Sequence, residues 1–152
     1  MALQTDYTQF QAAGYPGMHA NMEEWNGQTK TATDAIAFGA PVQRDGAKGC
    51  ETFASGGEFL GLAKAMHVAT GGTGDSYAAG DNVPVVDEGV WFVKAEGLTA
   101  GTDDGSTVRF NTATGAFTVA AASGTVLTIP GAEIDEVHSA TLATIRLRRV
   151  PA

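Results

Sequence analysis

Three histidines, one cysteine and a few serines are the side chains in this sequence with the most obvious catalytic or metal-binding chemistry. His19, His67 and His138 lie far apart, and no two of them have the i,i+4 or His-x-His spacing that places two imidazoles on one metal ion. Cys50 is the only cysteine, so no intrachain disulfide can form, and a lone cysteine favours a structural thiol over a nucleophile. No serine lies in a Gly-x-Ser-x-Gly elbow. These residues therefore predict no catalytic centre, no metal site and no cofactor.

Adjacent carboxylates occur three times, as Glu23-Glu24, Asp87-Glu88 and Asp103-Asp104. General acid–base catalysis needs carboxylates that converge in a cleft, whereas neighbours in a turn point into water. A divalent-cation site at Asp103-Asp104 is the alternative for one pair. The glycine-rich stretch 71–76 lacks the Gly-Lys-Ser/Thr ending of a phosphate-binding loop and predicts a plain loop.

Charge and composition narrow the class of protein. The 152 residues suggest one domain, and 17 acidic against 9 basic residues give a net charge of −8, which argues against binding to nucleic acid or to an anionic membrane. No apolar run is long enough for a membrane span, and the first ten residues lack the features of a signal peptide. Leu, Ile, Val and Phe number only 30, so we expect a thin core that partners help to bury.

Residues 1–30 form an N-terminal arm without period 2 or period 3.6. Pro16 and Gly17 mark a turn within it. Disordered tails are poor in aromatic residues. Besides Met1, this arm carries four aromatic residues and two methionines: Tyr7, Phe10, Tyr15, Met18, Met22 and Trp25.

The energetics of the arm predict that it orders on contact. Fixing ~30 residues costs roughly 1–2 kcal/mol each in backbone entropy. Burying its aromatic and methionine side chains returns on the order of 20–30 kcal/mol as an upper figure. We therefore expect the arm to be mobile alone and ordered when docked, either on a partner chain or on the protein's own body.

A body of short β segments follows, over residues 31–152. The stretch 58–68 suits a strand or a helix, and its glycine-rich flanks favour a strand. Strands at 8–12 residue spacing, with no long helix, predict an all-β sandwich or barrel. Three stretches have the pattern of two strands around a turn: 82–97 with its turn at Asp87-Glu88-Gly89, 106–120 with its turn at 112–115, and 132–150 with its turn at Ser139-Ala140.

Several short motifs occur in an order that resembles a known family. They are YPGM at 15–18, FLGLA at 59–63, AGDNVPVVDEGVWFVKAEG at 79–97, TAGTDDGSTVRFNTATGAFT at 99–118 and IPGAEIDEVHSATLATIRLRR at 129–149. Over about residues 14–149 this order is similar to the structural cement (head decoration) proteins of tailed bacteriophages. The sequence departs from the pattern at the last turn, which lacks a glycine, and in the glycine-rich loop 70–80.

The resemblance implies a jelly-roll-like β-sandwich or barrel with an extended N-terminal arm and no enzymatic activity. It implies a capsid cement or decoration protein that binds the outer surface of the phage head across major capsid protein subunits and stabilises the lattice. The chain would act as a homo-dimer or homo-trimer in the virion, assembled in the host cytoplasm, with no nucleic acid or membrane partner. We expect capsid or subunit contacts at Tyr7, Phe10, Tyr15, Pro16, Gly17, Met18, Met22, Trp25, Arg146, Arg148 and Arg149.

In this hypothesis the C-terminal arginines pair with an acidic capsid surface. The alternation of side chains along a strand would place Arg146 and Arg148 on one face. Two other functions stay open from the residues alone. One is a β-sandwich carbohydrate- or receptor-binding module, with Trp25, Trp91 and the tyrosines as a sugar platform. The other is a small β-barrel enzyme of cupin type, which needs histidines and a carboxylate to converge on a metal.

Overall fold

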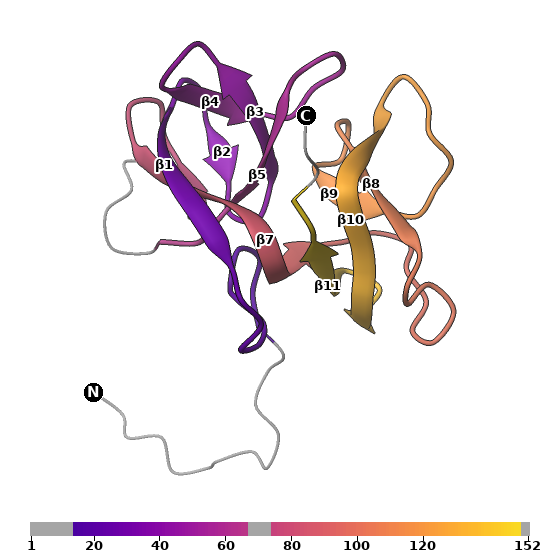
Figure 1. Ribbon diagram of the computed structural model, residues 1–152. Coiled ribbons are helices and arrows are strands. Elements are labelled where there is room, and N and C mark those ends of the chain that lie inside the picture. Colours follow the sequence, from indigo (N-terminus) through magenta and orange to yellow (C-terminus); the bar gives the residue numbers. More distant parts are fainter. Residues whose placement is uncertain (1–13, 67–73, 150–152) are drawn as a thin grey trace, which may run out of the picture.

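The computed structural model describes residues 14–66 and 74–149, and these residues form strands and no helix (Figure 1). In this described part of the chain there is accordingly no helix long and apolar enough to cross a membrane. The all-β prediction is confirmed. The strands are β1 Asn26–Ala32, β2 Ile36–Ala37, β3 Pro41–Asp45, β4 Gly49–Thr52, β5 Phe59–Ala63, β6 Ser76–Tyr77, β7 Asn82–Lys94, β8 Thr107–Asn111, β9 Ala116–Thr118, β10 Val126–Ser139 and β11 Leu142–Leu147.

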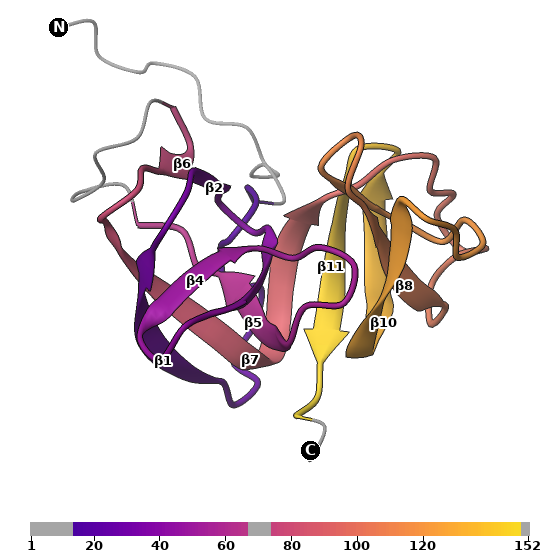
Figure 2. The same ribbon diagram turned by 90° about the horizontal axis from the view of Figure 1, so that it is seen from above.

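Nine of these strands form one sheet in the order β1-β4-β3-β5-β7-β11-β10-β8-β9, while β2 pairs with β6 separately. Strand β1 pairs with both β4 and β7. The barrel that this closes consists of β1, β4, β3, β5 and β7. In the other half of the sheet, an isolated bridge between Ala95 and Phe117 connects β9 to the residue that follows β7. Figures 1 and 2 show the result as two lobes joined by β7, which runs from one lobe into the other.

Strand β7 corrects the prediction of a hairpin at 87–89. Its 13 residues continue through Asp87-Glu88-Gly89 without a turn, and Gly89 adopts a φ of +107° within the strand. The residues before this point pair with β1 and those after it pair with β11. The turn-forming residues therefore lie where the strand passes between lobes, because a glycine with positive φ supplies local curvature as readily as a reversal.

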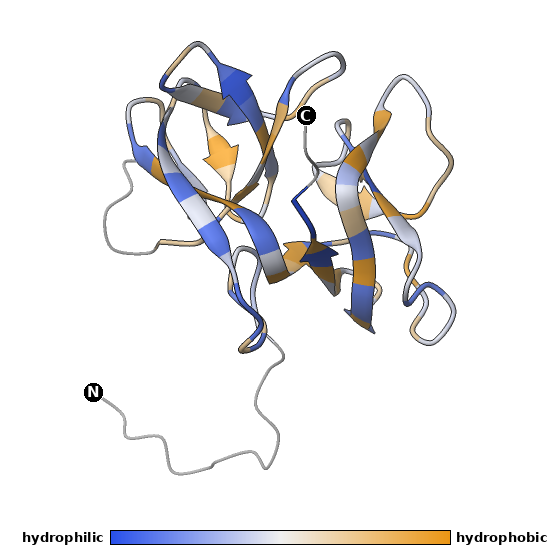
Figure 3. Cartoon of the chain, in the orientation of Figure 1, coloured by the Kyte–Doolittle hydropathy of each residue, from blue (hydrophilic) through white to orange (hydrophobic). Residues whose placement is uncertain are grey.

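Each lobe has its own core, and β7 contributes to both. Val83 and Val85 pack in the first barrel with Ile36 and Tyr77. Val86, Trp91 and Val93 belong to a second core, whose other large buried side chains include Phe110, Phe117, Ile129, Ile134, Ile145 and Leu147. Figure 3 shows apolar residues recurring along the strands of both lobes. Burial on both faces explains why residues 90–93 are all buried although they are consecutive in one strand.

Tyr77 is the largest polar side chain enclosed in the first barrel, where it is 0 % exposed. Its hydroxyl donates a hydrogen bond to the carbonyl oxygen of Lys64. Burial, with a smaller contribution from Asp81, raises the pKa of Tyr77 to about 12 from an ordinary 10.0. The folded state therefore holds this proton more tightly than the unfolded state does.

We expect Tyr77 to make stability fall at high pH. A folded-state pKa above the unfolded value gives stability that is complete below about pH 10 and is lost as pH rises toward about 12. The variant Tyr77→Phe should lack this alkaline loss while costing about 0.5–1.5 kcal/mol at pH 8 for the missing hydrogen bond. Urea unfolding at pH 8 and pH 11 measures both effects. The exposed Tyr15→Phe serves as control, and an equal alkaline loss in wild type and Tyr77→Phe would contradict the assignment.

Candidate functional site

Residues 14–25 lie along the edge of β7 opposite β11, between the two lobes. Strand β5 pairs with β7 only at Val85 and Val86, so the later part of that edge is open to another segment. The arm pairs there: the N–H of Ala20 donates to the carbonyl of Val90 at 2.9 Å, and the N–H of Phe92 donates to the carbonyl of Met18 at 2.9 Å. Docking on the protein's own body, one of the two expected outcomes for the arm, is therefore what these residues do.

The bend at Pro16-Gly17 fits between two other backbone segments. Gly17 has a φ of +84°, and its carbonyl accepts a hydrogen bond from the N–H of Ala65 at 2.9 Å. A Cβ added at Gly17 would lie 2.7 Å from the nitrogen of Ala65, and one added at Gly39 would lie 2.7 Å from the nitrogen of Gly17. Only glycine allows both the conformation and the approach, so the bend is fixed by its surroundings.

The far end of the arm is held by an aromatic cluster. The ring of Trp91 is 0 % exposed, with the rings of His19 and Trp25 against it at centroid distances of 4.7 and 5.7 Å. The Nζ atom of Lys64 lies 4.6 Å from the centroid of Trp25, at cation–π distance. The sugar-platform prediction for Trp91 is wrong, because the arm covers this side chain; Tyr77, another aromatic of that hypothesis, is also buried.

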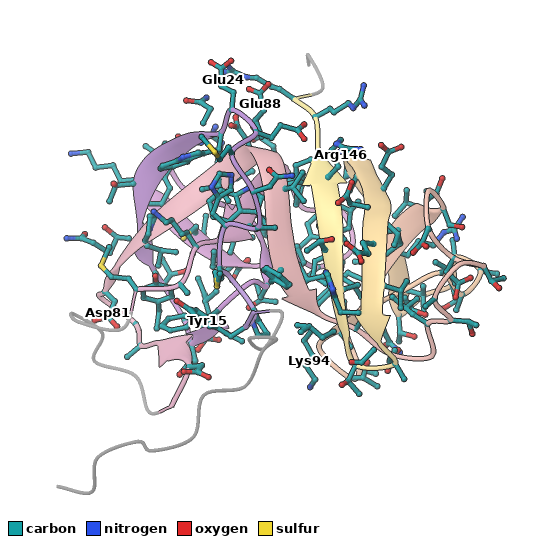
Figure 4. The ribbon with its side chains drawn as sticks, turned by 90° about the horizontal axis from the view of Figure 1, so that it is seen from below. Tyr15, Glu24, Asp81, Glu88, Lys94 and Arg146 are labelled. Carbon is teal, nitrogen blue, oxygen red and sulfur yellow. The ribbon has the colours of Figure 1, made fainter. Side chains whose placement is uncertain are left out.

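The outer side of the arm carries apolar surface. Among the described residues, the exposed large apolar side chains are Tyr15 at 43 %, Met22 at 101 %, Trp25 at 44 % and Met66 at 38 %. Three of them come from eleven consecutive residues, 15–25, and Figure 4 shows Tyr15 and Glu24 toward opposite ends of this face. The arm thus has one side that packs on β7 and one side that faces solvent.

Arg146 on β11 connects the arm to the second lobe through three carboxylates. Its guanidinium lies 2.8 Å from Asp135, 3.5 Å from Glu133 and 3.3 Å from Glu23 of the arm. Partial burial acts to lower the pKa of Arg146, but Asp135 and Glu23 outweigh it and the pKa is raised. The side chain is therefore already engaged within the chain and holds the turn at residues 21–24 against β10 and β11.

The other two C-terminal arginines also meet carboxylates of this chain. Arg148 lies 3.8 Å from Glu133, and Arg149 lies 3.7 Å from Asp87. Arg146 and Arg148 share Glu133, as expected for residues on one face of a strand. Arg148 and Arg149 are each about 70 % exposed, so their ion pairs are weak.

The structure places most of the predicted contact residues at this site. Tyr15, Met22 and Trp25 are exposed, Pro16 and Met18 are half-buried, and Gly17 is buried. Tyr7 and Phe10 lie outside the described residues, as does His67. Sequence reasoning did not find the roles of Glu23, Gly39 and Lys64, because each depends on contact with a segment far away in the chain. The signal for Glu23 that the sequence did offer is the position of Glu23-Glu24 between Met22 and Trp25.

The carboxylates at 103–104 have a structural role that the cation-site alternative did not include. Asp103 accepts a hydrogen bond from the N–H of Thr99 at 2.6 Å, and Asp104 accepts one from the N–H of Val137 at 2.9 Å. The first bond lies within the loop before β8, and the second ties that loop to β10. Nowhere in residues 14–66 and 74–149 do three His, Cys, Asp or Glu side chains gather as a metal-ligand set.

Two comparisons relate the chain to known proteins. A family model described as "Structural cement protein (E217 gp24/Pam3 gp6)" matches residues 3–148. The solved structure "The capsid of Myoviridae Phage XM1" contains a chain that is similar with a TM-score of 0.73 at 16 % sequence identity, over 96 % of this chain and 97 % of that one. At this identity the likeness shows a shared fold. The search of curated proteins finds no match.

We expect Gly17→Ala to loosen the arm. Both Gly17 and Gly46 have positive φ, at +84° and +69°, but an added Cβ meets the Ala65 backbone at the first and nothing within 4 Å at the second. Each alanine costs about 1–2 kcal/mol for its left-handed conformation. Gly17→Ala should in addition raise the exchange rates of the Ala65 and Phe92 amide hydrogens roughly tenfold. Amide exchange measured for both variants tests this, and equal rates would contradict the close-packed bend.

We expect Arg146→Gln to release the turn at residues 21–24. Arg146 is 28 % exposed and its loss leaves three carboxylates together, so the free energy of unfolding should fall by about 1 kcal/mol. Arg148→Gln removes one weak, exposed contact and should change it by less than about 0.5 kcal/mol. Denaturant unfolding at low salt and at about 1 M salt compares the two, and the difference should shrink at high salt. Equal effects would show that the carboxylate contacts of Arg146 add nothing.

Proposed function

The chain belongs to the family of phage structural cement proteins, and on this premise we propose that it binds the outer surface of the assembled phage head across neighbouring major capsid protein subunits and stabilises the lattice. It is a structural protein of the virion that associates with capsid proteins. The observation that carries the finer proposal is the apolar surface of residues 15–25, where Met22 is fully exposed on a turn held in place by Arg146.

The arm is already ordered on its own body, which favours tight attachment. A mobile arm would have to be fixed during binding, at roughly 1–2 kcal/mol of backbone entropy per residue. Residues 14–25 avoid this cost because β7 and Ala65 hold them before any partner arrives. The exposed side chains are therefore presented in a fixed arrangement, and preorganisation of this kind raises affinity without adding contacts.

We propose that copies act together, as a homo-dimer or homo-trimer assembled onto capsids in the host cytoplasm. A patch of three exposed apolar side chains supports only weak binding by one copy, whereas linked copies on a lattice bind with a high effective concentration. The net charge of −8 supports a protein partner over nucleic acid or an anionic membrane. We further propose that the chain catalyses no reaction.

The contact proposal is tested best by substitution, because a deletion of residues 1–30 would also remove residues 26–30, five of the seven in β1. We expect Tyr15→Ser combined with Met22→Ser to abolish or strongly reduce attachment to purified capsids that lack this chain. Met66→Ser is the control, since Met66 is also an exposed apolar side chain, at 38 %, but lies outside the arm. Co-sedimentation measures attachment, and thermal melting of the free proteins confirms that they are folded.

Capsid stability provides the second measurement. Capsids decorated with the wild-type chain should resist heat and dilution better than bare capsids or capsids mixed with the double variant. If decorated and bare capsids are equally resistant, stabilisation is the wrong role. If the double variant attaches as well as Met66→Ser does, the arm is not the contact surface.

A further inference from the structure

The turn that carries Met22 lies at a strongly acidic end of the molecule. This end, called the acidic end below, is where residues 21–25, the middle of β7 and the facing residues of β10 and β11 meet. Figure 4 shows Glu24 and Glu88 next to each other here, near Arg146. Building on the proposed capsid contact, we propose that the acidic end docks on a basic protein surface of the capsid, with Met22 and Trp25 entering an apolar recess edged by Lys or Arg side chains.

The apolar part of the acidic end is held firmly in place. Trp25 stands edge-on against the buried ring of Trp91, yet 44 % of its surface is exposed. Met22 is fully exposed, in a turn where the N–H of Glu23 donates to the side chain of Asn21 at 2.9 Å. Exposed large apolar side chains, here one braced by a buried ring and one on an adjacent turn, are typical of the centre of a protein–protein contact.

The charge around these two side chains is negative even after every arginine is counted. Arg146, Arg148 and Arg149 are the basic residues that form ion pairs here. Six carboxylates against these three guanidinium groups and the ammonium of Lys64, which lies 4.6 Å from the centroid of Trp25, leave a formal charge of −2. The carboxylates are Glu23, Glu24, Asp87, Glu88, Glu133 and Asp135.

Glu24 and Glu88 are the carboxylates of the acidic end that a partner would meet with their charge uncompensated. Neither forms an ion pair with any other residue of the described ranges, and Glu24 is exposed. An added Cβ at Gly89 would lie 2.9 Å from Cβ of Trp25 and 3.3 Å from the carbonyl oxygen of Glu24, so the backbone of residues 24 and 25 packs closely on the residue that follows Glu88. A partner surface covering Trp25 would therefore lie beside Glu24 and Glu88, whose side chains Figure 4 shows next to each other.

Charge decides which partner fits. The sequence suggested that the C-terminal arginines would pair with an acidic capsid surface, but these arginines face carboxylates of their own chain. An acidic partner, or the same end of a second copy related by two-fold symmetry, would bring like charges together at close range. A surface with Lys or Arg side chains around an apolar recess satisfies both the carboxylates and the methionine.

Charge reversal with a matched control tests this inference. The double variant Glu24→Lys/Glu88→Lys changes the net charge by the same amount as Asp34→Lys/Asp45→Lys, whose exposed carboxylates lie toward the opposite end of β1. Binding of fluorescently labelled chain to capsids lacking it would be titrated at low and at high salt. We expect the first variant to bind at least about tenfold more weakly than the control, and wild-type binding to weaken as salt rises.

The outcomes separate this inference from the proposed function. If Glu24→Lys/Glu88→Lys binds as tightly as the control, or more tightly, while wild-type chain still decorates capsids, the basic partner surface is wrong and the capsid role stands. If wild-type chain does not bind capsids at all, both proposals fail. Thermal melting of each variant, and wild-type-like Trp fluorescence, show that a loss of binding does not come from unfolding.

Discussion

The structure depends on a single long strand that must be paired along both edges. Strand β7 carries β1 and β5 on its first half and β11 on its second, and its side chains fill the cores of both lobes. This leaves one stretch of backbone, at Val90–Phe92, without a strand on the side opposite β11. Residues 17–20 complete that edge. The arm is therefore part of the sheet's hydrogen bonding, and its exposed side chains are a consequence of that position.

The parts of the fold that were predictable have local causes. The pair β8–β9 and the pair β10–β11 were predictable because their turn residues lie between two apolar alternations. Residues 87–89 are also of turn-forming types, but in the structure they bend a strand. Whether such residues form a hairpin turn or a bend within one strand depends on the strands that pair with them. The arm shows no period because it combines a two-residue bend, a short edge pairing and an exposed turn within twelve residues.

The candidate site was predictable in its apolar residues and not in its charges. Aromatic and methionine side chains in an unpatterned segment indicate a contact wherever the segment ends up, so Tyr15, Met22 and Trp25 could be named from the sequence. The partners of Arg146 could not, because Glu23 is 123 residues away and Glu133 and Asp135 come from another strand. With these carboxylates counted, the surface around the three arginines carries a net negative charge.

The shared strand also has a mechanical consequence. A force that draws the two lobes apart is carried by the covalent backbone of β7 from one lobe into the other. To detach the second lobe, six consecutive residue pairs between β7 and β11 would have to slide past one another together. A strand pair loaded in shear along the strands resists a larger force than one that is peeled apart, because peeling breaks its hydrogen bonds one after another. A chain built in this way resists forces that would separate its two lobes.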